Sequence, residues 1–170
     1  MTDKKVIQIA KWCALFAAIL MISFIVIFSI APESSIGVFL AMAGIFILTP
    51  VFYALYLIHH SEARIMGLLG LIFWFPAGAL DLISLLNHEN ATIYAIDSII
   101  FSLPLVIFGY LALISSKMPN GVGLIALISG LLYLISGMAT FLIPGNIAMY
   151  SGFGGLLFML IWFVWLFFIF

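Results

Sequence analysis

The chain has 170 residues, of which 67% are hydrophobic and 6% are charged, and its net charge is −1. A soluble domain of this length needs a polar surface that this composition does not supply, so the sequence belongs to the membrane class. The near-zero net charge also leaves no electrostatic basis for binding nucleic acid.

Six apolar runs fill most of the sequence, and each has the length of about 20 residues that an α-helix needs to cross the hydrocarbon core. In chain order the predicted spans are residues 12–30, 36–58, 65–86, 91–114, 122–143 and 147–170. A membrane β-barrel would need alternating segments of about 10 residues, and these runs do not alternate. Short turns make consecutive spans antiparallel neighbours. We therefore predict a single all-α integral membrane domain, a bundle of six transmembrane helices.

The basic residues predict the orientation of this bundle. They all fall in alternate connections, and they are Lys4, Lys5, Lys11, Arg64 and Lys117. Because Lys and Arg in short loops favour the cytoplasmic side, both termini are predicted to be cytoplasmic. We expect the protein to lie in the inner membrane of a prokaryotic cell.

The first predicted span also resembles the hydrophobic part of a signal peptide, because lysines precede it and small residues follow it. The run at 12–30 is longer than the about 7–15 residues of a signal sequence, so we expect a retained helix. One face of this helix has small residues at four-residue spacing, Ala10, Ala14 and Ala18. Such a ridge is expected either to pack inside the bundle or to dock another membrane protein or a second copy.

The predicted cytoplasmic turn at 59–64 contains His59, His60 and Glu62. Adjacent histidines point about 100° apart on a helix, so they do not chelate a metal as an i, i+4 pair does. We expect a solvated helix end here, with no metal site. The single cysteine, Cys13, excludes disulfides within the chain and cysteine-based metal centres, and no cofactor is predicted.

Two aspartates inside predicted spans are the main candidates for function. Asp81 and Asp97 are each eight residues from Glu89 in the predicted outer turn, so antiparallel helices place them at one depth. An aspartate at the centre of a span costs about 3 kcal/mol on insertion scales. Two adjacent carboxylates can share one proton, or bind a cation or the amine of a ligand, from the outer side.

Hydroxyl groups near the two aspartates complete this candidate site, and their residues are Ser84, Tyr94, Ser98 and Tyr133. Tyr133 belongs to a polar stripe on the fifth span that also contains Ser129, Ser136 and Thr140. The hydroxyls are expected either to line an outward-facing pocket or to bond across helices and to their own backbone. In the second case the aspartates only stabilise the bundle, or one of them is exposed near the membrane interface.

Several short motifs in the C-terminal half occur in the order found in a known family. They are Phe108-Gly109-Tyr110, Ser115-Ser116-Lys117-Met118-Pro119, Gly130-Leu131-Leu132-Tyr133, Phe141-Leu142-Ile143-Pro144 and Leu160-Ile161-Trp162. In these motifs the chain resembles a large bacterial and archaeal family of multi-pass membrane proteins of unknown function, whose members look like six-helix proteins. The chain has Phe158 and Met159 where an acidic residue often precedes the last tryptophan. Its helix–Pro-Gly–helix hairpins are similar, more weakly, to a bacterial acid-resistance membrane protein family.

The sequence contains no Ser/His/Asp or HExxH arrangement, so we expect a non-enzymatic protein. The leading hypothesis is a membrane protein that binds a small ligand, proton or cation in an outward-facing polar pocket. The alternative is an accessory or structural subunit of a larger membrane complex. One such subunit, the substrate-binding subunit of a vitamin transporter, is similar in size, helix number and the alanine ridge on its first helix.

Overall fold

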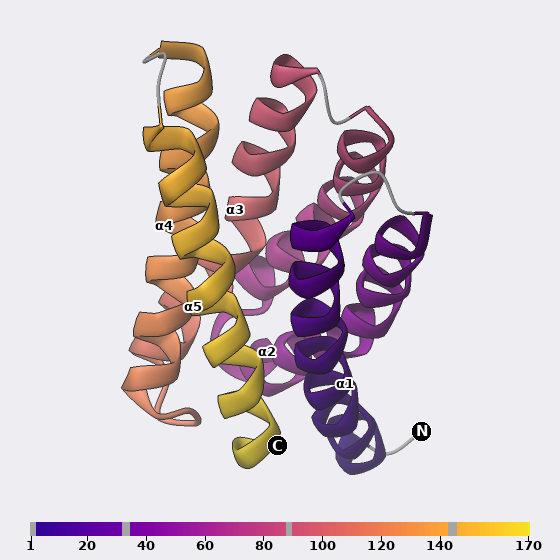
Figure 1. Ribbon diagram of the computed structural model, residues 1–170. Helices are drawn as coiled ribbons and strands as arrows, with labels where there is room; N and C mark the ends of the chain where they lie inside the picture. Colours follow the sequence, from indigo (N-terminus) through magenta and orange to yellow (C-terminus); the bar gives the residue numbers. More distant parts are fainter. Residues whose placement is uncertain (1–2, 32–34, 88–89, 143–145) are drawn as a thin grey trace.

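The computed structural model describes residues 3–31, 35–87, 90–142 and 146–170. Within these residues the chain forms five helices that pack side by side in one all-α bundle (Figure 1). They are α1 (Asp3–Ile30), α2 (Ser35–Leu86), α3 (Ala91–Ile114), α4 (Asn120–Leu142) and α5 (Ile147–Ile169). All five are long and apolar enough to cross a membrane.

Five helices stand where the sequence predicts six, because the second and third predicted spans belong to α2, which has 52 residues. This helix is broken at Ala63, whose φ of −147° and ψ of 59° are not helical. The predicted turn at 59–64 is therefore reduced to one residue. Ala63 divides α2 into a first arm, residues 35–62, and a second arm, residues 64–86.

The two arms of α2 lie side by side and run in opposite directions (Figure 1). The indole N–H of Trp74 on the second arm donates a hydrogen bond of 3.1 Å to the Thr49 hydroxyl on the first arm. Further from the break, a Cβ on Gly78 would lie 2.7 Å from Cγ2 of Ile45. These contacts step away from Ala63 on both arms together, which is the register of an antiparallel helical hairpin.

The helices α3 and α4 approach each other closely because glycines line the α4 face of their contact. Gly123, Gly130 and Gly137 are seven residues apart, and each faces α3. A Cβ on Gly123 would lie 2.7 Å from the Gly109 carbonyl oxygen, and one on Gly137 would lie 2.6 Å from the Ala95 carbonyl oxygen. Glycine permits this backbone-to-backbone contact, which is a common source of helix association in lipid.

Large aromatic rings fill the half of the bundle that contains Ala63. The Phe52 ring lies at centroid distances of 4.3 Å from Trp74, 5.7 Å from Phe108 and 6.1 Å from Trp162. All four side chains are at most 1% exposed. This aromatic cluster joins both arms of α2 to α3 and α5.

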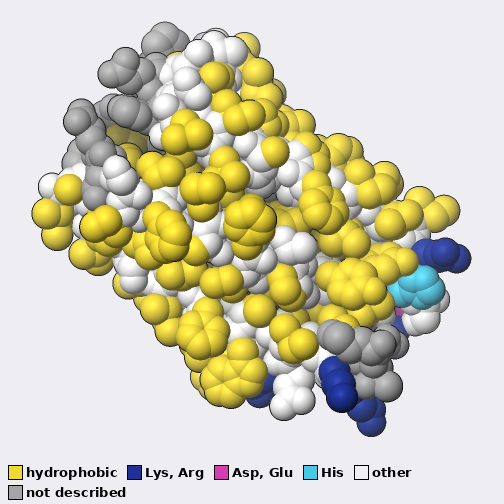
Figure 2. Space-filling view, turned by 90° about the vertical axis from the view of Figure 1, so that its right-hand side faces the viewer, with side chains coloured by type: hydrophobic (Ala, Val, Ile, Leu, Met, Phe, Trp, Pro, Cys, Tyr) yellow, Lys and Arg dark blue, Asp and Glu magenta, His cyan; other side chains and the backbone are white. Residues whose placement is uncertain are grey.

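The alanine ridge of α1 packs inside the chain. Ala10 and Ala14 are 0% exposed and Ala18 is 2% exposed, and Ala10 belongs to a small core cluster with Ala54 of α2. The opposite face of α1 is half exposed, as Trp12 shows. Apolar side chains cover much of the molecular surface in Figure 2, as expected for a surface that faces lipid.

Both termini lie at the end of the bundle where α2 is broken (Figure 1). The Lys and Arg side chains visible in Figure 2 also gather at one end. Lys117, from the α3–α4 connection, donates a 2.7 Å hydrogen bond to the Ile58 carbonyl oxygen and another to the Ser61 hydroxyl. Both acceptors lie within five residues of Ala63, so Lys117 links the α3–α4 connection to the end of the first arm beside the break.

Candidate functional site

Two cavities meet at Asp81 and Asp97. The inner cavity has a volume of about 160 Å³ and is lined by residues of all five helices, among them Met21, Leu40, Trp74, Phe101, Tyr133 and Met159. The outer cavity has a volume of about 500 Å³, and its lining includes Phe28, Ser84, Tyr94, Tyr133, Gly152 and Phe153. Both aspartates, with Tyr94 and Tyr133, line both cavities, so they stand at the boundary between the two.

The aspartates lie near the end of the bundle opposite the termini. Asp81 precedes the end of α2 at Leu86 by five residues, and Asp97 follows the start of α3 at Ala91 by six. At about 1.5 Å per residue, both lie about 8–9 Å inside their helix ends, so they lie at nearly one depth, as the sequence predicts. The outer cavity therefore occupies the last turns of the bundle, and the inner cavity reaches towards its middle.

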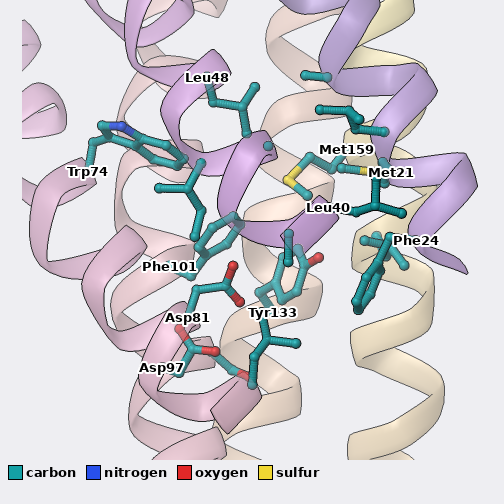
Figure 3. A pocket seen from close by; sticks show the side chains of 18 of the residues that line it. Met21, Phe24, Leu40, Leu48, Trp74, Asp81, Asp97, Phe101, Tyr133 and Met159 are labelled. Carbon is teal, nitrogen blue, oxygen red and sulfur yellow. The ribbon is translucent and has the colours of Figure 1, made fainter. Parts of the chain in front are cut away.

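The two carboxyl groups lie beside each other next to the Tyr133 ring (Figure 3). They are close enough to interact electrostatically, and Ser84 interacts with the Asp97 carboxyl. Asp97 is 6% exposed, and its buried Oδ1 atom has no hydrogen-bond partner among the described residues. No Lys, Arg or His lines either cavity in the described part of the chain. The site is therefore a pair of carboxyl groups without a positive partner.

The start of α3 fixes the register of its site residues. Asn90 caps the helix, and its side-chain oxygen accepts hydrogen bonds from the backbone N–H groups of Thr92, at 3.1 Å, and Ile93, at 3.2 Å. An asparagine cap of this kind determines where a helix begins. Counting from that cap, Asp97 and Ser98 fall on the buried side of α3.

Tyr94 is held by a chain of hydrogen bonds that crosses three helices. Its hydroxyl lies 2.9 Å from the Ser136 hydroxyl on α4, which donates its single proton to the Ala148 carbonyl oxygen on α5 at 2.7 Å. Tyr94 is therefore the donor to Ser136. A Cβ on Gly152 would lie 2.6 Å from the Tyr94 hydroxyl oxygen, so glycine makes room for this chain.

The polar stripe of α4 divides into two roles. Ser129 donates a 2.7 Å hydrogen bond to the Gly155 carbonyl of α5, and Thr140 donates one of 2.9 Å to the Ser136 carbonyl of its own helix. These bonds match the expectation that such hydroxyls bond across helices or back to their own. Tyr133 lines both cavities instead, and it makes no hydrogen bond among the described residues.

The structure brings all six predicted site residues to the walls of the two cavities. Ser98 lines the inner cavity, Ser84 lines the outer one, and both are buried. Asp81 makes no hydrogen bond within the described chain, whereas Asp97 interacts with the Ser84 hydroxyl, so only one of the two aspartates has a hydroxyl partner of the kind that the stabilising role requires. Burial of Asp97 also differs from an aspartate exposed at the interface.

Sequence reasoning missed the aromatic wall of the inner cavity. The Phe101 ring lies 6.0 Å from Trp74 and 5.2 Å from Tyr133 between centroids, in edge-to-face contacts. Helical spacing carried a signal for both, because Phe101 is four residues after Asp97 and Trp74 is seven before Asp81. Residues of α1, such as Met21, also line the inner cavity, and no spacing in the sequence relates them to the aspartates.

The prediction of a solvated helix end at the histidines is wrong for His59. Its side chain is 0% exposed and both ring nitrogens lack hydrogen-bond partners among the described residues, whereas His60 is exposed. Because α2 stays helical up to Ala63, it carries His59 into the bundle rather than into a turn. The described residues contain no group of three or more metal-ligating side chains.

Comparison with family models, curated proteins and solved structures finds no match for this chain. The resemblance of the C-terminal half to a six-helix membrane family stays a prediction. The functional argument therefore rests on the geometry of the two cavities and the carboxyl pair between them.

Proposed function

We propose that this chain is a non-enzymatic integral membrane protein that binds a small ligand, proton or cation in a pocket opening on the outer side. The observation that carries the proposal is the paired carboxyl groups of Asp81 and Asp97 at the junction of two cavities. One of their oxygens is buried and lacks a hydrogen-bond partner among the described residues.

A positively charged or proton-bearing ligand suits this site for two physical reasons. Buried polar atoms in proteins nearly always have a partner, so the unpaired Asp97 oxygen is left with an unused capacity to accept a hydrogen bond. Two neighbouring carboxylates also repel each other, and a bound cation or a shared proton removes that repulsion. A ligand with a donor and a positive charge would supply what the protein itself does not.

We further propose that the chain crosses the membrane six times, with both termini in the cytoplasm of a prokaryotic cell. The antiparallel arms of α2 support two crossings by this helix, and the other four helices supply one each. The gathering of basic residues at the end with the termini supports the orientation. Fusions after Phe170 test this orientation. A fluorescent protein fused there is expected to fluoresce, because it folds in the cytoplasm. A fusion that does not fluoresce, together with an alkaline phosphatase fusion at the same position that is active, would contradict the orientation.

The binding proposal is tested by native mass spectrometry of the protein extracted gently from its own membrane. A stoichiometric small adduct is expected in the natural protein and is expected to disappear in Asp97→Asn. Glu62→Gln, which removes an exposed carboxylate near the break in α2, is the matched control and should keep the adduct. Equal spectra for all three proteins, with no adduct, would contradict the proposal.

The alternative function is an accessory or structural subunit of a larger complex, and its sequence support is the alanine ridge of α1 together with the small share of the chain outside the apolar runs. Ala10, Ala14 and Ala18 are buried within the chain and are not available to a partner, so the pocket is the better supported proposal. A stoichiometric protein that co-purifies in place of a small adduct would favour the alternative.

A further inference from the structure

The inner cavity indicates which chemical class of ligand the site would accept. This inference rests on the proposed binding function. We infer that the ligand is a small organic ammonium ion whose charged group lies at Asp81 and Asp97 and whose apolar body fills the inner cavity. The carboxyl groups, the cavity and its aromatic wall each contribute one part of this argument.

The carboxyl pair recognises the charged group. Asp97 has a buried oxygen without a hydrogen-bond partner, and Asp81 lies beside it with no hydrogen bond among the described residues (Figure 3). A primary ammonium group carries three N–H donors and one positive charge, so it can bond to both carboxylates at once. Hydrogen bonds between ionised partners are about twice as strong as neutral ones.

The inner cavity recognises an apolar body. Most of its lining is hydrophobic, for example Leu40, Leu48 and Met159, and its volume is about 160 Å³. An engineered apolar cavity of about 150 Å³ in another protein stays dry and binds benzene. The space beyond the carboxyl pair is therefore of the size that accepts one six-membered ring or a short branched chain.

Three aromatic rings line the wall of the inner cavity that also contains the carboxyl pair. Phe101 lies in edge-to-face contact with both Trp74 and Tyr133, and all three rings border the inner cavity (Figure 3). Aromatic faces attract an organic cation within about 6 Å of the ring centroid. The indole N–H of Trp74 is bonded to Thr49, so the Trp74 ring adds no free hydrogen-bond donor that would repel a cation.

The same site suits a metal ion or a bare proton less well. Calcium takes about 6–8 oxygen ligands and magnesium needs an octahedron of them, whereas the described residues hold no cluster of three or more metal-ligating side chains. A proton would need the carboxyl pair but not the apolar space behind it. An organic ammonium ion uses both parts of the site.

Gly44 offers a way to fill the inner cavity without disturbing the carboxyl pair. It lines this cavity on the first arm of α2, and a Cβ at this position would meet no atom within 4 Å. Gly44→Leu should therefore occupy the apolar space, whereas Gly44→Ala adds one methyl group and serves as the control. Ala41→Leu, on the same cavity wall, repeats the test if Gly44→Leu does not fold.

The experiment measures equilibrium binding of three probes to the full chain in lipid nanodiscs: benzylammonium, methylammonium and benzyl alcohol. Benzylammonium is expected to bind at least about tenfold more tightly than methylammonium, because its ring is buried, and than benzyl alcohol, because it is charged. Gly44→Leu should weaken benzylammonium by about tenfold or more and leave methylammonium unchanged, and Gly44→Ala should change neither by more than about threefold. Asp97→Asn should weaken both cations.

The outcomes separate the two proposals. If methylammonium binds as tightly as benzylammonium and Gly44→Leu changes neither, the inner cavity does not hold the ligand and this inference is wrong, while the proposed binding function stands. If benzyl alcohol binds as tightly as benzylammonium, the carboxyl pair does not select a charge and the inference is equally overturned. If neither cation binds the natural protein, the ammonium inference is wrong, and the proposed function fails as well only if native mass spectrometry finds no adduct that Asp97→Asn removes.

Discussion

The two halves of the bundle differ in how their interior is filled. The half with Ala63 and the termini is packed with large rings around Phe52. The opposite half contains the outer cavity, part of the inner one, and the two aspartates at their junction. From this comparison we expect the packed half to supply most of the stability, and we propose that the hollow half supplies the binding site.

Buried polar atoms occur in both halves, but their surroundings differ. In the packed half, His59 and the Trp162 indole nitrogen also lack hydrogen-bond partners among the described residues, yet neither residue lines the two cavities. In the hollow half, Asp97, the residue with the unpaired oxygen, lines both cavities. Proteins often keep strained or unpaired groups at functional sites and offset their cost elsewhere.

The largest effect on stability is expected from the packed half. Phe52→Ala should lower the free energy of unfolding by about 3–5 kcal/mol, because it removes a fully buried ring that touches three others. Phe46→Ala, on the same arm but 70% exposed, is the matched control and should change little. A titration with denaturing detergent measures both, and equal losses would contradict the division into two halves.

The next largest effect is expected at the α3–α4 contact. Gly123→Val places a side chain 2.7 Å from the Gly109 carbonyl oxygen, so the helices must separate and the protein should lose about 1–3 kcal/mol or more. Gly154→Ala is the control, since its Cβ would meet only the end of the Leu132 side chain, at 3.3 Å. Thermal unfolding followed by tryptophan fluorescence distinguishes them, and a Gly123→Val protein as stable as the control would show that this contact is not tight.

A smaller effect is expected in the hollow half, at the hydrogen-bond chain that holds Tyr94. Ser136→Ala breaks both of its bonds across helices and should cost about 1 kcal/mol. Thr140→Ala removes only a bond within α4 and should cost less. Ser136→Ala should also weaken benzylammonium binding, because Tyr94 borders both cavities, and unchanged binding would place Tyr94 outside the site.

The smallest effect is expected at the break in α2. Lys117→Met removes two exposed hydrogen bonds to the residues just before Ala63, and should lower stability by less than about 1 kcal/mol. Lys5→Met, an exposed lysine in the described chain for which no such bond exists, is the control. Hydrogen exchange at residues 58–62 should rise only in Lys117→Met, and equal exchange in both would show that Lys117 does not stabilise the break.

The all-α fold of apolar helices could be predicted because hydropathy acts over whole helices. Asp81 and Asp97 could be paired because a short turn fixes antiparallel register, and charged residues inside apolar runs are conspicuous. The extension of helical structure through residues 59–62, up to the break at Ala63, could not be predicted, because polar residues such as those at 59–64 are compatible with either a turn or a helix. Burial of His59 depends on that extension of the helix.

The aromatic wall and the cavities could not be predicted from the sequence. Trp74 and Phe101 are hydrophobic residues in hydrophobic helices, so composition does not separate a cavity wall from ordinary core. The empty space at Gly44 depends on how five helices fit together, which no local pattern encodes. The glycines of α4 at seven-residue spacing did carry a signal of close packing against a neighbour.

The most direct test of the central claim is the free energy of unfolding of the Asp81→Asn/Asp97→Asn double variant in lipid. If the aspartates exist for binding, removing two repelling carboxyl groups without positive partners should leave stability unchanged or raise it by about 1 kcal/mol, while cation binding is lost. A loss of more than about 2 kcal/mol would show that the pair holds the bundle together, and would contradict the binding site proposed for it.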